Sequence, residues 1–182
     1  LGVKDGVLAF TFPDFAVTVE EEKKQAADPK AAEEVKSELN EIIGLSEVKD
    51  YVLSLEQNYI IQRLREARGM KADVPTMHMI FTGNPGTGKT TIARLVSRYL
   101  KAMGVLSGGQ LIEVTRADLV GKYVGHTAPL TQQVIRSALG GVLFIDEAYS
   151  LYRGADDSFG LEAIDTIVKG MEDHREDLIV IL

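Results

Sequence analysis

The chain has 182 residues with a formal net charge of −7, and 45% of them are hydrophobic, which is enough for one domain of ordinary size with an extension. The acidic balance gives no general attraction for nucleic acid, so binding to DNA or RNA would need a local basic patch, and none is evident. There is no cysteine, which excludes disulfides and thiolate metal sites and fits a reducing compartment.

Residues 1–37 are expected to form an extension or linker before the main domain. Loose alternation of apolar residues on either side of Pro13 predicts two short strands joined by a turn at that proline. Residues 20–34 are charged and rich in alanine, which indicates a linker or an exposed helix. Asp28 followed by Pro29 is a suitable N-cap and first residue for such a helix.

Residues 38–182 are expected to form the main domain, in which helices and strands alternate. The predicted elements are a helix from Ser46 to Gly69, a strand at 76–81, a helix from the glycine-rich loop to Gly104, a strand at 111–115, a helix from Pro129 to Gly140, a strand at 142–146, a helix at about 159–173 and a strand at 178–182. This alternation predicts an α/β fold of three layers with a parallel sheet. The apolar runs 142–145 and 178–182 indicate central strands covered on both faces.

The segment GNPGTGKT, from Gly83 to Thr90, satisfies the pattern G-x-x-x-x-G-K-[ST] between a predicted strand and a predicted helix. Its glycines let backbone N–H groups turn inward around phosphate oxygens, and the helix N-terminus adds partial positive charge. Lys89 supplies a charge for the β- and γ-phosphates, and the hydroxyl of Thr90 is a hard oxygen ligand for Mg²⁺. The predicted nucleotide-binding residues of this segment are Gly83, Asn84, Pro85, Gly86, Thr87, Gly88, Lys89, Thr90 and Thr91.

The apolar strand at 142–145 ends in Asp146 and Glu147. A carboxylate at the carboxyl end of a central strand faces the ligand crevice of an open α/β sheet. An acidic pair in this position is more often a solvated turn, but the phosphate loop changes that balance. We predict that Asp146 holds Mg²⁺, mostly through water, and that Glu147 and Lys89 are catalytic, with Glu147 polarising the attacking water.

The segment DLVG at 118–121 matches the D-x-x-G switch of a GTPase. In a GTPase that aspartate should end an apolar strand, whereas Asp118 follows Thr115, Arg116 and Ala117. No [NT]-K-x-D motif that would read guanine is present in the sequence. The pattern therefore favours an ATPase.

Three segments, FTGNPGTGKTTIARL, LVGKYVGHT and GVLFIDEAYSL, together resemble the AAA+ ATPases, and more narrowly their CbxX/CfqX branch. The resemblance covers residues 38–182 and, by general similarity, favours the sporulation-type members of the branch over the rubisco-activase type. It implies the large subdomain of a P-loop NTPase (AAA+) core, truncated before the fifth strand and the helical lid. Sensor 1, the arginine finger and sensor 2 would then lie beyond Leu182.

The resemblance also implies roles for two further segments. Ile42, Ile43 and Gly44 would contact adenine, although the two isoleucines could equally belong to the core. Tyr123, Val124 and Gly125 match an aromatic–hydrophobic–glycine loop that lines the pore of a ring, usually a hexamer, and pulls on a polypeptide; the alternative is an ordinary surface loop. Gly121 and Gly125 would act as hinges of this loop.

The sequence thus predicts a ring-forming, ATP-driven remodeller of an unidentified protein substrate, with ATP and Mg²⁺ as cofactors. No apolar run approaches the roughly 20 residues of a membrane span and no signal peptide opens the chain, so we expect a cytoplasmic, bacterial protein with neither membrane nor nucleic-acid partners. Without an arginine finger the chain would bind Mg-ATP but hydrolyse it slowly, if at all. The alternatives are a nucleotide-dependent scaffold or switch and a nucleic-acid-directed AAA+ motor.

Overall fold

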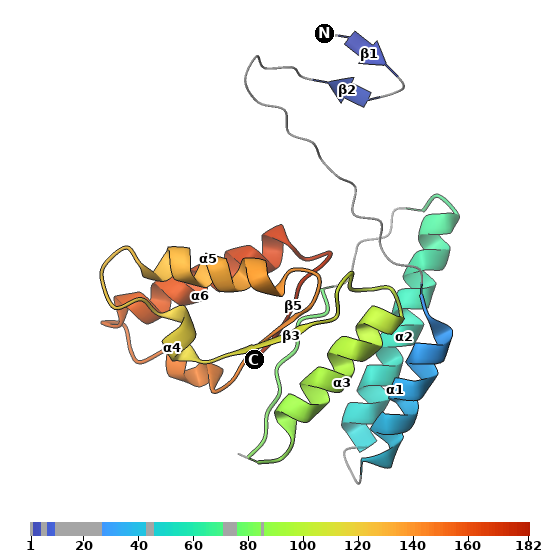
Figure 1. The fold of residues 1–182 in the computed structure, drawn as a ribbon, viewed down its shortest axis with the longest axis horizontal. Coiled ribbons are helices and arrows are strands. Elements are labelled where there is room, and N and C mark those ends of the chain that lie inside the picture. Colours follow the sequence, from blue (N-terminus) through green and yellow to red (C-terminus); the bar gives the residue numbers. More distant parts are fainter. Residues whose placement is uncertain (1, 5–6, 10–26, 43–45, 71–75, 85) are drawn as a thin grey trace.

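The computed structural model describes residues 2–4, 7–9, 27–42, 46–70, 76–84 and 86–182 (Figure 1). The predicted turn at Pro13, the first part of the charged segment 20–34, the predicted adenine contacts Ile43 and Gly44, and Pro85 of the phosphate loop lie outside the described residues.

Three parallel strands form the main sheet in the order β3 (Leu111–Val114), β4 (Val142–Ile145) and β5 (Ile179–Ile181). The segment 76–81, predicted as a strand, lies parallel to β5 on its other side but pairs through a single bridge, from Met79 to Ile181. Its hydrogen bonds run from the Met79 N–H to the Val180 carbonyl, 3.0 Å, and from the Leu182 N–H to the Met79 carbonyl, 3.0 Å. The loop that follows residue 81 therefore leaves the carboxyl edge of the sheet, as the sequence predicts.

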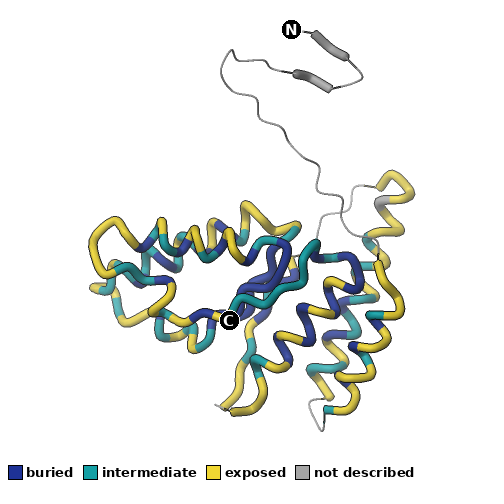
Figure 2. Tube along the Cα trace, in the orientation of Figure 1, coloured by how far each residue is buried: buried dark blue, intermediate teal, exposed yellow. Residues whose placement is uncertain are grey.

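Side chains of the strands alternate between two separate apolar cores, because successive residues of a strand point to opposite faces. Val142, Phe144 and Ile181 belong to one core, and Leu143 and Val180 belong to the other. All residues of β4 and β5 are buried, which confirms the prediction of central strands covered on both faces. Figure 2 shows the buried strands between helices whose outer sides are exposed.

Helices α1 (Pro29–Glu41), α2 (Ser46–Ala67) and α3 (Lys89–Ala102) cover the first of these faces (Figure 1). The carboxylate of Asp28 caps α1 by accepting hydrogen bonds from the N–H groups of Lys30, 3.1 Å, and Ala31, 3.2 Å. This confirms the predicted N-cap. The expected boundary at residue 37 falls inside α1, whose buried residues Ala32 and Val35 already belong to the core.

A partly buried polar network links these three helices. The hydroxyl of Tyr99 on α3, which is 1% exposed, donates to Glu56 of α2 at 2.8 Å. The same carboxylate lies 2.9 Å from the ammonium of Lys36 on α1. The charged groups satisfy one another, so the long helix α2 is held against both of its neighbours.

Helices α4 (Arg116–Leu119), α5 (Thr127–Ala138) and α6 (Ser158–Asp173), with the short 3-10 helix η1 (Ala148–Leu151), cover the other face. Helix α5 begins two residues before the predicted start at Pro129, which is compatible with proline because the first turn of a helix needs no N–H partner. The sequence did not predict α4 or η1, since four residues are too few to show a helical period.

In the N-terminal part of the chain, β1 (Gly2–Lys4) pairs antiparallel with β2 (Val7–Ala9). Both strands precede Pro13, and the strand predicted after that proline lies outside the described residues. Of the helices that the structure describes, none combines the length and the apolar character that crossing a membrane requires.

Candidate active site

The phosphate loop connects the edge segment 76–81 to α3. Gly86 and Gly88 have φ angles of +77° and +84°, in the left-handed region that favours glycine. Gly88 is the N-cap of α3 and has no side chain to bond the first N–H groups of the helix. These N–H groups are thus left for a ligand, and the helix dipole favours an anion there.

The side chain of Lys89 folds back over this loop. Its ammonium donates hydrogen bonds to the carbonyls of Gly83, 2.9 Å, and Asn84, 3.2 Å. The hydroxyl of Thr87 also donates to the Asn84 carbonyl, at 2.8 Å. The loop is therefore wrapped around a positive charge.

A cavity of about 880 Å³ joins the phosphate loop to the carboxyl end of β4. Its volume is within the range of small-molecule sites in proteins. Most of the residues predicted from the two motifs line this cavity, and Asn84 and Thr87 act instead by shaping the loop. The predicted residues along its wall are Gly83, Gly86, Gly88, Lys89, Thr90, Thr91, Asp146 and Glu147.

The acidic pair is positioned by the last hydrogen bond of the sheet, from the Asp146 N–H to the Val114 carbonyl at 2.8 Å. Glu147 follows in the left-handed conformation, with φ 50° and ψ 44°, which is rare for a residue with a side chain. Among the described residues it is the only non-glycine with a positive φ. Such strain at a cavity wall persists where the surrounding structure enforces it, often at a functional site.

Tyr149 also lines the cavity, and the sequence did not predict it. It is 77% exposed, and the nearby Glu147 carboxylate raises the pKa of its phenol by disfavouring a second negative charge. Its position two residues after the acidic pair is the signal in the sequence that could have identified it, because η1 is too short to show a helical pattern.

Oxygen ligands suitable for Mg²⁺ occur on two sides of the cavity, as the Thr90 hydroxyl and the Asp146 carboxylate. The Thr90 hydroxyl donates a hydrogen bond to the Glu113 carboxylate of β3 at 3.3 Å, so the lone pairs of the Thr90 oxygen remain free to face a cation. In the part of the chain that the structure describes, no three His, Asp or Glu side chains gather as a metal site of their own. Mg²⁺ characteristically binds through one or two protein oxygens plus substrate phosphates, so this donor set fits it.

Ile42 is half-buried at the end of α1 and packs against the core of α1 to α3. It lines a second hollow of about 420 Å³ rather than the main cavity, and Thr91 lines both. The predicted adenine contact thus adjoins the phosphate loop through Thr91.

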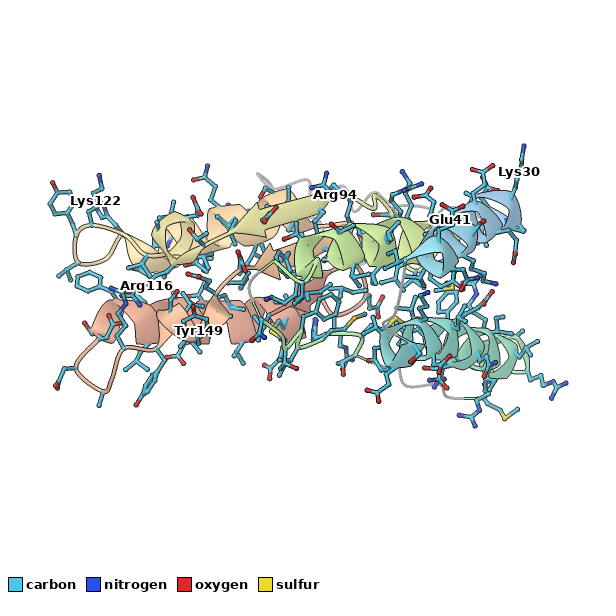
Figure 3. The ribbon with its side chains drawn as sticks, turned by 90° about the horizontal axis from the view of Figure 1, so that it is seen from below. Lys30, Glu41, Arg94, Arg116, Lys122 and Tyr149 are labelled. Carbon is cyan, nitrogen blue, oxygen red and sulfur yellow. The ribbon has the colours of Figure 1, made fainter. Side chains whose placement is uncertain are left out.

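The predicted pore loop, Tyr123 to Gly125, lies in the segment 121–126 between α4 and α5 at one end of the molecule, where Figure 3 labels Lys122. Tyr123 and Val124 are 68% and 88% exposed. The ring of Tyr123 meets that of His126 edge-on, with centroids 5.5 Å apart. Tyr123 and Val124 are therefore exposed to solvent on a segment that is neither a strand nor a helix.

The two glycines of this loop differ from each other. Gly125 has a φ of +79° and open space around it, as a hinge would. At Gly121 an added Cβ would lie 2.7 Å from the Cβ of His126. The Gly121 N–H donates a hydrogen bond to the Thr127 hydroxyl at 3.1 Å. Gly121 therefore closes the base of the loop by close approach of two backbone segments, a role different from the predicted hinge.

Comparison with known proteins agrees with this geometry. The family model described as "ATPase family associated with various cellular activities (AAA)" matches residues 79–182, from the edge segment to the last strand. The chain belongs to the AAA family. The predicted resemblance and the predicted three-layer α/β class are both confirmed.

Relatives at about half identity include both predicted types of the CbxX/CfqX branch. Stage V sporulation protein K of Bacillus subtilis is 47% identical over 160 residues, covering 88% of this chain and 50% of the relative. A chloroplastic ribulose bisphosphate carboxylase/oxygenase activase of Cyanidioschyzon merolae is 52% identical over 143 residues, covering 78% and 47%. The plasmid protein CbxX of Cupriavidus necator is 50% identical over 143 residues, covering 78% and 45%.

The AAA chain thus spans about half the length of the curated relatives it matches. Among solved structures, the FIGL-1 AAA domain in complex with ADP aligns with a TM-score of 0.51 at 24% identity, covering 76% of this chain and 45% of that one. This likeness supports the AAA fold.

Proposed function

We propose that this AAA chain is the Mg-ATP-binding core of a ring-forming ATPase that couples hydrolysis to the remodelling of a protein substrate. The observation that carries the proposal is a single cavity that brings Lys89 and the phosphate loop, from one motif, to Asp146 and Glu147, from the other. Both motifs are short, and Lys89 and Glu147 lie 58 positions apart in the sequence, so the fold is what brings them together.

ATP binding follows from the loop and the helix behind it. The N–H groups at the start of α3 and the ammonium of Lys89 would bind the phosphate oxygens, in exchange for the loop carbonyls that Lys89 now bonds. Thr90 and Asp146 would hold Mg²⁺, which supplies positive charge that offsets the negative charge of the phosphates. Ile42, Ile43 and Gly44 remain our proposed adenine contacts.

Hydrolysis needs a base that can orient water against the terminal phosphate. Glu147 lines the cavity from a backbone turn fixed by β4 on one side and η1 on the other. Its carboxylate would accept a hydrogen bond from the attacking water and so orient it for attack. Lys89 would stabilise the charge that develops on the phosphate oxygens.

Remodelling of a protein substrate is proposed from the loop at 121–126. Exposed Tyr123 and Val124 offer apolar contact area without reading side-chain identity, as a loop that grips varied polypeptides requires. The names of two relatives, a rubisco activase and a sporulation protein, give the biological settings in which such a substrate would be sought. Hexameric assembly and a cytoplasmic location remain predictions.

The hydrolytic part of the proposal is tested by Glu147→Gln, which keeps the shape of the side chain and removes its basicity. We expect ATP binding to be retained and phosphate release to be lost. Phosphate release by Glu147→Gln at the rate of the parent would refute this role of Glu147.

The remodelling part is tested separately by Tyr123→Ala in the full chain. We expect binding of ATP to be unchanged and remodelling of the substrate to be lost. If both hydrolysis and remodelling are unchanged, the loop has no pore role. If function instead survives Glu147→Gln, the chain is a nucleotide-dependent switch in which binding alone matters.

A further inference from the structure

Arg116, the first residue of α4, joins three segments on the face of the sheet that carries α5 and α6. Its guanidinium donates to the carbonyls of Ser150, 3.1 Å, and Leu151, 2.9 Å, at the end of η1. It also donates to the carboxylate of Asp157 at 3.0 Å and forms an ion pair with it at 2.8 Å. Both charged side chains are only 15% exposed, so this pair is partly withdrawn from water.

The partner carboxylate is itself fixed by α6. Asp157 is the N-cap of that helix and accepts a hydrogen bond from the Gly160 N–H at 3.1 Å. A Cβ at Gly160 would lie 2.1 Å from the Leu151 carbonyl oxygen and 2.7 Å from the guanidinium of Arg116. The lack of a side chain at Gly160 therefore leaves the space in which the arginine binds.

Arg116 holds the backbone that follows Glu147 in the candidate active site. Helix η1 starts directly after Glu147, whose left-handed conformation is unfavourable for a residue with a side chain. The sheet fixes one end of this turn through the Asp146 N–H, and Arg116 fixes the other end through the last carbonyls of η1. Strained backbone of this kind is maintained where both flanks are held.

Arg116 also lies close in sequence to the base of the exposed loop at 121–126. Arg116 begins α4, which ends at Leu119, two residues before Gly121 at the base of the loop. The other end of this short helix is also held, because the buried Thr131 hydroxyl donates to the Leu119 carbonyl at 2.9 Å. Figure 3 shows Arg116, Lys122 and Tyr149 toward the same end of the molecule. One side chain thus connects the turn at Glu147 with the base of the loop at 121–126.

We propose that Arg116, held by Asp157, is a positioning residue that fixes the turn at Glu147 and transmits the nucleotide state of the cavity to the loop at 121–126. The inference rests on the proposed ATPase function, because it concerns the same cavity. It adds a physical connection: η1 cannot shift on the arrival or loss of a γ-phosphate without displacing the guanidinium at the start of α4.

The sequence offers a direct probe of this connection. The chain contains no tryptophan, so Tyr123→Trp places a single indole in the exposed loop. Its emission is compared in the 182-residue chain with Mg-ADP and with a non-hydrolysable Mg-ATP analogue. Affinity for both nucleotides is measured by calorimetry. The kinetic constants kcat and KM for ATP are measured in proteins that retain Tyr123.

Two variants weaken the connection in different ways, at Arg116 itself and at the carboxylate that holds it. Arg116→Lys keeps the charge but lacks the fork that bonds both the carbonyls and the carboxylate, and Asp157→Asn keeps the shape but removes the charge. We expect each to abolish the emission difference between nucleotide states and to lower kcat about 10- to 100-fold. KM and Kd should stay within about threefold of the parent, which separates positioning from loss of binding.

A matched control is Asp177→Asn. Asp177 also accepts two hydrogen bonds from a neighbouring segment, from the N–H and hydroxyl of Ser107 at 3.0 and 2.8 Å, but it precedes β5 at the opposite edge of the sheet. We expect it to resemble the parent in emission difference and in kcat. A general loss of stability would lower the emission difference and kcat in all three variants, and urea unfolding of each variant detects such a loss.

The outcomes separate the inference from the function on which it rests. If the parent binds nucleotide but its indole does not respond, or if both variants keep the response and kcat, the role of Arg116 is refuted while ATP binding stands. If the parent shows no calorimetric binding of Mg-ATP, the proposed function itself fails and this inference fails with it. Should Arg116→Lys not fold, the near-isosteric Asp157→Asn still decides the question.

Discussion

The substitution Gly160→Ala tests the packing around Arg116 through the stability of the chain. Alanine has a higher helix propensity than glycine, by about 1 kcal/mol in a helix interior, so propensity alone would stabilise α6. The new Cβ would lie 2.1 Å from the backbone oxygen of Leu151 and 2.6 Å from the carboxylate of Asp157. Overpacking of a well-packed site typically costs about 1–3 kcal/mol, which exceeds the gain. We therefore expect a net loss of stability.

The matched comparison is Gly170→Ala in the same helix. There the added Cβ would lie 2.7 Å from the Cδ1 atom of Ile135, the end of a flexible side chain that can rotate away. The gain in propensity is similar and the steric cost is smaller, so we expect a change near zero.

Urea and thermal unfolding of the two variants and the parent measure this difference. For a chain of this size, each kcal/mol corresponds to roughly 2–4 °C in Tm. We expect Gly160→Ala to unfold several degrees below the parent and Gly170→Ala close to it. If Gly160→Ala is as stable as the parent, then η1 and Arg116 are not packed as described and the argument for the positioning role loses its structural basis.

Tyr99→Phe removes the part-buried hydrogen bond to Glu56 and should lower the free energy of unfolding by about 1.5–3 kcal/mol in urea titrations, since a charged acceptor loses its donor. An unchanged midpoint would contradict this. Arg116 lowers the pKa of the Asp157 carboxyl. The ion pair therefore stabilises the folded chain above the pKa that Asp157 has in the unfolded chain, and this stabilisation is lost as the pH falls through the pKa of the folded chain. The loss of stability on acidification should be smaller in Asp157→Asn than in the parent, and equal losses would count against the ion pair. Glu113→Ala removes the acceptor that orients the Thr90 hydroxyl. It should raise the Mg²⁺ concentration needed for ATP binding by roughly 10-fold and leave metal-free binding unchanged. A Mg²⁺ titration identical to that of the parent would exclude this role of Glu113.

The sequence predicted the parts of the fold that repeat a local pattern. Long helices such as α2 and α3 show a helical period over several turns, and the buried strands β4 and β5 are short apolar runs. The two nucleotide motifs could be recognised because the chemistry of phosphate binding fixes residue types at fixed spacing. The structure adds that both motifs line one cavity.

The parts that the sequence did not predict depend on contacts between distant segments. Arg116 and Asp157 are 41 positions apart, and neither belongs to a motif. Helices α4 and η1 are too short for a period, and the close approach at Gly121 depends on the return of the chain at Thr127. The left-handed turn at Glu147 could not be predicted either, because a side chain disfavours it and only the surrounding structure enforces it.

We propose that ATP binds in the cavity between the phosphate loop and the acidic pair. Calorimetric titration of Mg-ATP into the parent and into Lys89→Ala measures this binding directly. We expect the parent to bind with one site for each chain. We expect Lys89→Ala to bind roughly 10- to 100-fold more weakly, because it loses a charge-assisted hydrogen bond to phosphate. Equal affinity of the two proteins for Mg-ATP, or no binding by the folded parent, would contradict ATP binding at this site.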